Sequence, residues 1–119
     1  MKVCIPTESN FGLDDHLSQH FGRAQTFTVV DMETGKVKVI RNDSSHMGGS
    51  KLPPEILAEH GVDVMIVGGL GPKAITMFES FGIKVVVGGS GLVRDVIEDW
   101  KAGNLRKATI DDGCLEHRH

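Results

Sequence analysis

The sequence predicts a single three-layer α/β domain, in which helices cover both faces of a mixed sheet of five strands. The chain has 119 residues, the usual length of one domain. The pattern V-G-G-x-G occurs twice, at Val67–Gly71 and Val87–Gly91, and each copy closes a β-branched run and opens an amphipathic segment. A continuous apolar run that stops at glycines and passes into helical periodicity is typical of a buried parallel strand followed by a helix.

The individual elements follow from the hydrophobic pattern and from turn-forming residues. Strands are expected at 2–6, 26–32, 36–41, 62–67 and 83–87, and helices at 53–60, 72–81 and 91–101. Pro6 ends the first strand, and the turn signal Glu33–Gly35 predicts a hairpin between the second and third strands. Pro53 and Pro54 suit the first turn of a helix. The glycines expected to cap the three helices are Gly61, Gly82 and Gly103.

The predicted order is a strand, a hairpin, a helix and then two strand–helix units. This order favours parallel strands where helices cross over and antiparallel strands at the hairpin. It is the arrangement of a ribonuclease-H-like sheet, although periodicity alone does not separate that sheet from other three-layer α/β folds. The domain is expected to span residues 1–105 and a polar tail residues 106–119, with a short extended segment near the junction.

Charge and composition exclude several classes of protein. The net charge of −3 and the pI near 6.0 argue against a nucleic-acid partner, which a basic face would normally mark. No apolar run is long enough for a membrane span and the N-terminus has no signal-peptide core, so we expect a cytoplasmic protein without a membrane partner. The sequence has no nucleophile elbow, zinc-hydrolase motif or P-loop, which favours a non-catalytic protein. The low aromatic content favours a monomer.

The two glycine turns are the first candidate site. Because both follow parallel strands, we expect them at the carboxyl edge of the sheet, where open α/β sheets bind ligands and helix N-termini offer N–H groups to an anion. The candidate ligand-binding glycines are Gly68, Gly69, Gly71, Gly88, Gly89 and Gly91. The alternative is that these glycines only provide tight turns. Valine at position 69 or 89 is expected to weaken ligand uptake more than stability if a ligand approaches there.

The segment 14–24 is the second candidate, because it gathers two carboxylates, two histidines and an arginine before a strand. His16 and His20 are four residues apart, a spacing that on a helix would bring both imidazoles to one metal ion. Gly22 and the absence of an apolar stripe argue against a helix here. A solvated loop is therefore the alternative interpretation.

The string L-S-Q-H-F-G-R-A at Leu17–Ala24, followed by Phe27 and Asp31, resembles the S-x-H-F-G-R-A…F…D signature of the dinitrogenase iron-molybdenum cofactor biosynthesis proteins. These are small NifX-like proteins, and the same domain forms the C-terminal part of NifB-type proteins. The similarity covers about residues 1–105. Its further matching positions are Asn42, Gly61–Asp63, the glycines of 68–71 and Gly82–Ile83.

The resemblance implies a ribonuclease-H-like fold without nuclease chemistry and a protein that carries or inserts metal–sulfur clusters. The cargo would be an iron–sulfur precursor of the nitrogenase cofactor or, as in some small relatives, a molybdenum–copper sulfide cluster held without covalent bonds. Cluster donor and acceptor proteins would be the partners. The family motif singles out His20 as a metal ligand. Arg23 and the glycine N–H groups would complement such a bulky anion electrostatically.

The tail contains a third candidate, because the thiolate of Cys114 and the imidazoles of His117 and His119 have a spacing that allows one metal ion to be shared. Leu115–His117 is also similar to a vector-derived junction with a histidine tag. Cys4 lies within a strand pattern and is expected to be a small buried side chain. His46 is expected in a surface loop.

Three functions therefore remain open on the sequence alone. The first is a non-catalytic carrier of a metal–sulfur cluster. The second is a regulatory or interaction domain that binds a small anionic metabolite or a partner protein at the glycine-rich edge. The third is a hydrolase of phosphate esters, which the missing catalytic motifs disfavour.

Overall fold

Within residues 1–42 and 52–108, which the computed structural model describes, six strands form one mixed sheet in the order β3-β2-β1-β4-β5-β6. The strands are β1 Lys2–Thr7, β2 Thr26–Asp31, β3 Val37–Arg41, β4 Val64–Ile66, β5 Lys84–Val87 and β6 Arg106–Lys107. The helices are α1 Pro53–Glu59, α2 Pro72–Ser80 and α3 Val93–Lys101, with the short 3-10 turns η1 Gly12–Asp14 and η2 Phe21–Arg23. Every predicted strand and helix of the first 105 residues is present.

The two glycine turns lie at the same edge of the sheet, as predicted, because β4 and β5 are parallel neighbours. β1 is parallel to β4 and antiparallel to β2. Thr7 at the end of β1 therefore pairs with Thr26 at the start of β2. The segment that leads into β2 thus reaches the carboxyl edge, where the glycine turns are.

The sheet has six strands rather than the five expected. In the sixth, β6, Lys107 and Arg106 pair antiparallel with Val86 and Val87 of β5, and the adjacent Ala108 is buried. Two exposed basic residues show no apolar alternation, so pairing with the edge of β5 makes them a strand and the local pattern carries no signal. The remainder of the expected tail lies outside the described residues.

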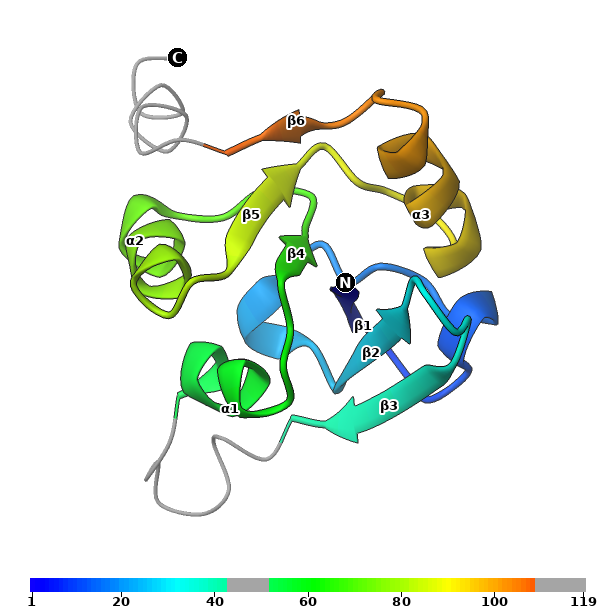
Figure 1. Cartoon of the computed structure of the whole chain (residues 1–119), viewed down its shortest axis with the longest axis horizontal. Coiled ribbons are helices and arrows are strands. Elements are labelled where there is room, and N and C mark those ends of the chain that lie inside the picture. Colours follow the sequence, from blue (N-terminus) through cyan, green and yellow to red (C-terminus); the bar gives the residue numbers. More distant parts are fainter. Residues whose placement is uncertain (43–51, 109–119) are drawn as a thin grey trace.

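Helices cover both faces of the sheet, as predicted (Figure 1). On one face, α1 and α2 contribute Leu57 and Phe78 to a core that also contains Cys4 of β1. On the other face, α3 contributes Val96 to a second core that contains Ile5 of β1. Side chains that alternate between two cores mark β1 as a strand buried on both faces.

The helices end where the glycines predict. Gly61, Gly82 and Gly103 follow the three helices with φ values of 77°, 79° and 80°, the left-handed conformation that terminates helices. α3 begins at Val93 rather than at residue 91, because Gly91 itself has a φ of 89°. None of the helices in the described ranges is long and apolar enough to cross a membrane.

The link between β1 and β2 is irregular apart from η1 and η2, which agrees with the lack of a period in its sequence. The carboxylate of Asp15, only 2% exposed, organises its first half. It accepts the N–H groups of Ser9, Phe11 and His16 at 3.0, 3.2 and 2.7 Å. Three backbone donors satisfy this buried charge and fix the loop without a helix.

Candidate functional site

The segment Leu17–His20 passes over both glycine turns. The Leu17 N–H donates to the carbonyl oxygen of Gly91 at 2.9 Å, and Gln19 Nε2 donates to the carbonyl oxygen of Gly89 at 3.2 Å. The segment is also tied to β1, since the Ser18 N–H donates to the carbonyl oxygen of Pro6 at 2.8 Å. The two regions that the sequence singles out separately therefore form one surface. We call it the carboxyl-edge site, and it comprises residues 17–23, 68–71 and 88–91.

The packing of this segment explains why two positions in the turns, 68 and 89, are occupied by glycine. A Cβ at Gly68 would lie 2.0 Å from Gln19 Oε1. A Cβ at Gly89 would lie 2.9 Å from Leu17 Cδ1 and 3.3 Å from Ile66 Cγ2. The chain's own loop, rather than a ligand, occupies the space next to Gly89. The expectation that valine at 89 would affect ligand uptake more than stability is therefore replaced by an expected loss of stability.

Gly71 and Gly22 differ from these two glycines. A Cβ at either position would meet no atom within 4 Å, and neither has a positive φ. Gly71 is the N-cap of α2 with a φ of −70°. Gly88 and Gly91, by contrast, have φ values of 100° and 89°, which strongly favour glycine. The backbone is thus open to solvent at Gly71 and Gly22, and the fold does not require glycine at either position.

The hydrogen bonds show which N–H groups at this edge are available to an anion. The N–H groups of Gly88 and Gly89 donate to the carbonyl oxygens of Gly68 and Val67 at 3.1 and 3.0 Å, so they hold the two turns together. In the described part of the chain, the N–H groups of Gly69, Gly71, Ser90 and Gly91 donate to no protein acceptor. The first turn of α2 adds N–H groups that have no acceptor within the helix.

His20 lies on a turn that is fastened from both sides. The preceding Gln19 is bonded to a glycine turn, and the following Phe21 packs against Phe27 and Phe78, with ring centroids 5.8 and 5.6 Å apart. The His20 carbonyl oxygen accepts the Arg23 N–H at 2.8 Å, which closes η2. Both side chains are exposed. The structure therefore presents an imidazole and a guanidinium on a positioned backbone.

The other candidate residues are not part of this arrangement. His16 is exposed and forms an extended bridge with Leu92, so it does not share a helical face with His20. Cys4 is fully buried, as predicted, and burial raises the pKa of its thiol far above the usual range. The motif residue Asp31 lies at the opposite edge, at the end of β2. Outside the described residues lie His46, Cys114, His117 and His119.

Among the described residues, no group of three or more His, Cys, Asp or Glu side chains is placed to hold a metal ion. Sequence reasoning also assigned no role to Gln19, although it stands beside His20 in the motif. Its position depends on contacts across 70 residues of sequence. The glycine turns themselves could have indicated this role, because glycines leave space beside the backbone that a side chain from another segment has to fill.

Comparison with known proteins places this geometry in a family. The family model described as dinitrogenase iron-molybdenum cofactor matches residues 1–103. An uncharacterised protein of Methanocaldococcus jannaschii is 31% identical over 112 residues, which cover 90% of this chain and 91% of the relative.

Solved structures of similar proteins agree with this family assignment. The apo form of the orange protein from Desulfovibrio gigas has a TM-score of 0.80 at 31% identity, covering 91% of this chain and 92% of that one. A Thermotoga protein provisionally described as a NifB protein has a TM-score of 0.75 at 28% identity, covering 89% and 91%. The match to the family model spans nearly the whole described domain. The chain therefore belongs to the dinitrogenase iron-molybdenum cofactor family.

Proposed function

We propose that this protein binds a metal–sulfur cluster or its precursor at the carboxyl-edge site and carries it without catalysing a reaction. Membership of the family supports metal–sulfur chemistry. One observation carries the location, namely that the turn bearing His20 is held by Gln19 on the glycine turns and by Phe21 on the core. A metal-ligating side chain on a turn that is already held in place loses little entropy when the metal binds.

Each part of the site has a distinct role in this proposal. His20 supplies an imidazole ligand to a metal of the cluster. The guanidinium of Arg23 and the N–H groups of Gly69, Gly71 and Gly91 complement the negative charge of the cluster sulfides. The remaining glycines, Gly68, Gly88 and Gly89, shape the turns and admit the loop.

Reversible binding is consistent with the donor set. The chain has two cysteines, fewer than the four thiolates that anchor iron–sulfur clusters permanently. One of them, Cys4, is buried. Cys114, His117 and His119 stay predicted additional ligands. We further propose a cytoplasmic monomer of the ribonuclease-H-like fold that exchanges its iron–sulfur or molybdenum-containing cluster with donor and acceptor proteins.

Anaerobic reconstitution tests the proposal. Apo protein is mixed under argon with iron and sulfide, or with thiomolybdate and copper, and is then desalted. The proposal predicts sulfide-to-metal charge-transfer absorption that elutes with the protein and is absent when serum albumin replaces it. If the absorption stays with the small molecules in every mixture, the carrier function is wrong. The regulatory or interaction domain that binds a small anion or a partner protein would then be the better hypothesis.

A further inference from the structure

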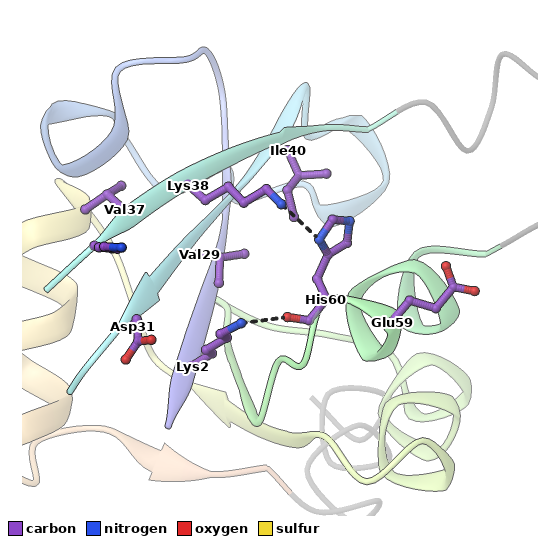
Figure 2. Close-up of a pocket in the computed structure, with 9 residues that line it drawn as sticks. Lys2, Val29, Asp31, Val37, Lys38, Ile40, Glu59 and His60 are labelled. Carbon is purple, nitrogen blue, oxygen red and sulfur yellow. Dashed lines mark hydrogen bonds between the residues drawn. The ribbon is translucent and has the colours of Figure 1, made fainter. Parts of the chain in front are cut away.

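A cavity of about 460 Å³ lies at the amino edge of the sheet, on the face covered by α1 (Figure 2). Lys2 begins β1, Asp31 ends β2 and His60 directly follows α1. Because β1 and β4 are parallel and the glycine turns follow the carboxyl end of β4, this cavity is at the opposite edge from the carboxyl-edge site. The proposed function does not use it.

Two lysines converge on one residue in this cavity. Lys2 Nζ donates to the carbonyl oxygen of His60 at 3.3 Å, and Lys38 Nζ is 3.4 Å from His60 Nδ1. An ammonium group only donates, so the His60 ring accepts the bond from Lys38. Figure 2 shows the two side chains approaching His60 from β1 and β3, on either side of Val29. Each ammonium keeps further N–H donors that these contacts do not use.

The cavity has a surplus of positive charge. Lys36 is the third lysine that lines it. In the part of the chain that the structure describes, none of these three lysines forms an ion pair with a carboxylate. The Glu59 carboxylate points away from the lysines in Figure 2. The opposing charges are the carboxylates of Asp31 and Glu59, which both line the cavity. Three ammonium charges against two carboxylates leave a surplus of about one positive charge on a chain whose net charge is −3.

Asp31 stays ionised at neutral pH. Its carboxylate accepts the N–H groups of Glu33 and Thr34 at 2.9 and 3.4 Å. The bond from Glu33, above all, lowers the pKa of Asp31 from its ordinary value. The lysine surplus is therefore partly offset by a permanent negative charge, which limits the charge of an anion that the cavity can hold.

We propose that this cavity binds a small organic anion with two negative charges, a phosphate monoester or a dicarboxylate. The volume lies in the range of small-molecule sites and exceeds what inorganic phosphate fills. Val29 and Ile40 give the cavity apolar wall surface for the organic part of the ligand. The contacts of Lys2 and Lys38 with His60 hold both ammonium groups in place before a ligand arrives, which reduces the cost of ordering them.

A nuclear magnetic resonance titration of the whole protein tests this inference. Phenyl phosphate, succinate and inorganic phosphate are added separately to ¹⁵N-labelled protein at constant ionic strength. We expect saturable shifts of the amides of Lys2, Val29, Lys38 and His60 with phenyl phosphate or succinate, and weaker binding of inorganic phosphate. The stronger of the two organic probes identifies the ligand class.

Three variants test how the charge of each residue affects the affinity for the anion. Lys38→Met keeps the aliphatic stem and should weaken binding about tenfold, the effect of one charge-assisted hydrogen bond. Asp31→Asn should strengthen binding severalfold. Lys101→Met removes an equal charge from the exposed end of α3 and should leave the affinity unchanged. The absence of saturable shifts, or equal weakening by Lys38→Met and Lys101→Met, would overturn the inference.

Cluster reconstitution separates this inference from the proposed function. Lys38→Met should take up cluster like the wild-type protein, since the two sites lie at opposite edges. If the wild type takes up no cluster but binds phenyl phosphate in this cavity, the carrier function fails and the inference stands. If cluster uptake is normal and no anion binds in this cavity, the carrier function stands and the inference fails.

Discussion

Gln19 and Gly89 are joined by a hydrogen bond of 3.2 Å from Gln19 Nε2 to the glycine carbonyl oxygen, and this bond connects the His20 loop to the second glycine turn. The other side-chain atom of the same amide, Oε1, fills the place where a Cβ of Gly68 would be. One side chain therefore covers both glycine turns. This relationship makes a single site of two stretches that are far apart in sequence.

Replacement of Gln19 tests that connection. Gln19→Ala should lower the free energy of unfolding by about 0.5–1.5 kcal/mol, because the hydrogen bond and the cover over Gly68 are both lost. Gln25→Ala is the matched control, since this exposed glutamine forms hydrogen bonds only through its backbone N–H and carbonyl groups among the described contacts. Its effect should stay within about 0.5 kcal/mol. Equal losses in urea denaturation of the two variants would contradict the connection.

The glycines of the turns should respond differently to alanine. Gly89→Ala should lower the free energy of unfolding by about 1–3 kcal/mol, because the new methyl group meets Leu17 and Ile66. Gly71→Ala should change it by less than about 0.5 kcal/mol, since nothing lies within 4 Å. Urea denaturation measures both. Similar stabilities of the two variants would show that the Leu17 loop yields easily at Gly89.

Gly71→Ala is also a probe of ligand approach that leaves the fold intact. If the cluster uses the open backbone before α2, this variant should take up less cluster at unchanged stability. Reconstitution followed by metal analysis of the desalted protein measures the uptake. Wild-type uptake by Gly71→Ala would remove the N-terminus of α2 from the proposed site.

The Cys4 thiol should be chemically inert in the native protein. Burial keeps it protonated, because its pKa is raised far above the usual range, and the thiolate is the reactive form. Iodoacetamide at slightly alkaline pH should modify Cys4 only after denaturation, as measured by mass spectrometry of the N-terminal peptide. Modification at similar rates with and without denaturant would contradict the buried position.

Asp31 should stabilise the fold in a pH-dependent manner. Because the folded protein lowers its pKa, the contribution is present above the ordinary value of 3.8 and is lost as the pH falls through the lowered value. Asp31→Asn keeps an acceptor for the N–H groups of Glu33 and Thr34 and removes the charge. The wild type should be more stable than this variant at neutral pH, and the difference should shrink below pH 3.8. A difference that is constant with pH would contradict this origin.

Much of the fold could be predicted because the relevant signals are local. Continuous β-branched runs identify β4 and β5, and glycines with φ near 80° end the three helices at Gly61, Gly82 and Gly103. The hairpin is equally local. Asp31 accepts two turn N–H groups and Gly35 has a φ of 77°. In each case a few neighbouring residues determine the conformation.

The features that were missed depend on contacts between distant segments. β6 is a strand because Arg106 and Lys107 meet the edge of β5. The conformation of the 8–25 segment depends on the buried carboxylate of Asp15 and on Gln19. The partner of Gln19 is 70 positions away in the sequence. The family motif marked His20 and Arg23 as candidates but did not show what holds them. Their function stays a prediction that only binding measurements test.

The role of His20 is tested by comparing His20→Ala with wild type, His16→Ala and Arg23→Lys in anaerobic cluster reconstitution. All three substitutions are at exposed positions, so each should change the free energy of unfolding by no more than about 0.5 kcal/mol. His16→Ala is the matched control, because it removes an imidazole from the same loop but outside the family motif. Arg23→Lys keeps the charge and loses the planar, multidentate donor, so partial uptake is expected.

The quantity to measure is the charge-transfer absorption that remains with the desalted protein per mole of chain. We expect that His20→Ala retains almost none of this absorption, while His16→Ala retains the wild-type amount. A His20→Ala protein that is folded and binds cluster like wild type would show that His20 is not the metal ligand of the carboxyl-edge site.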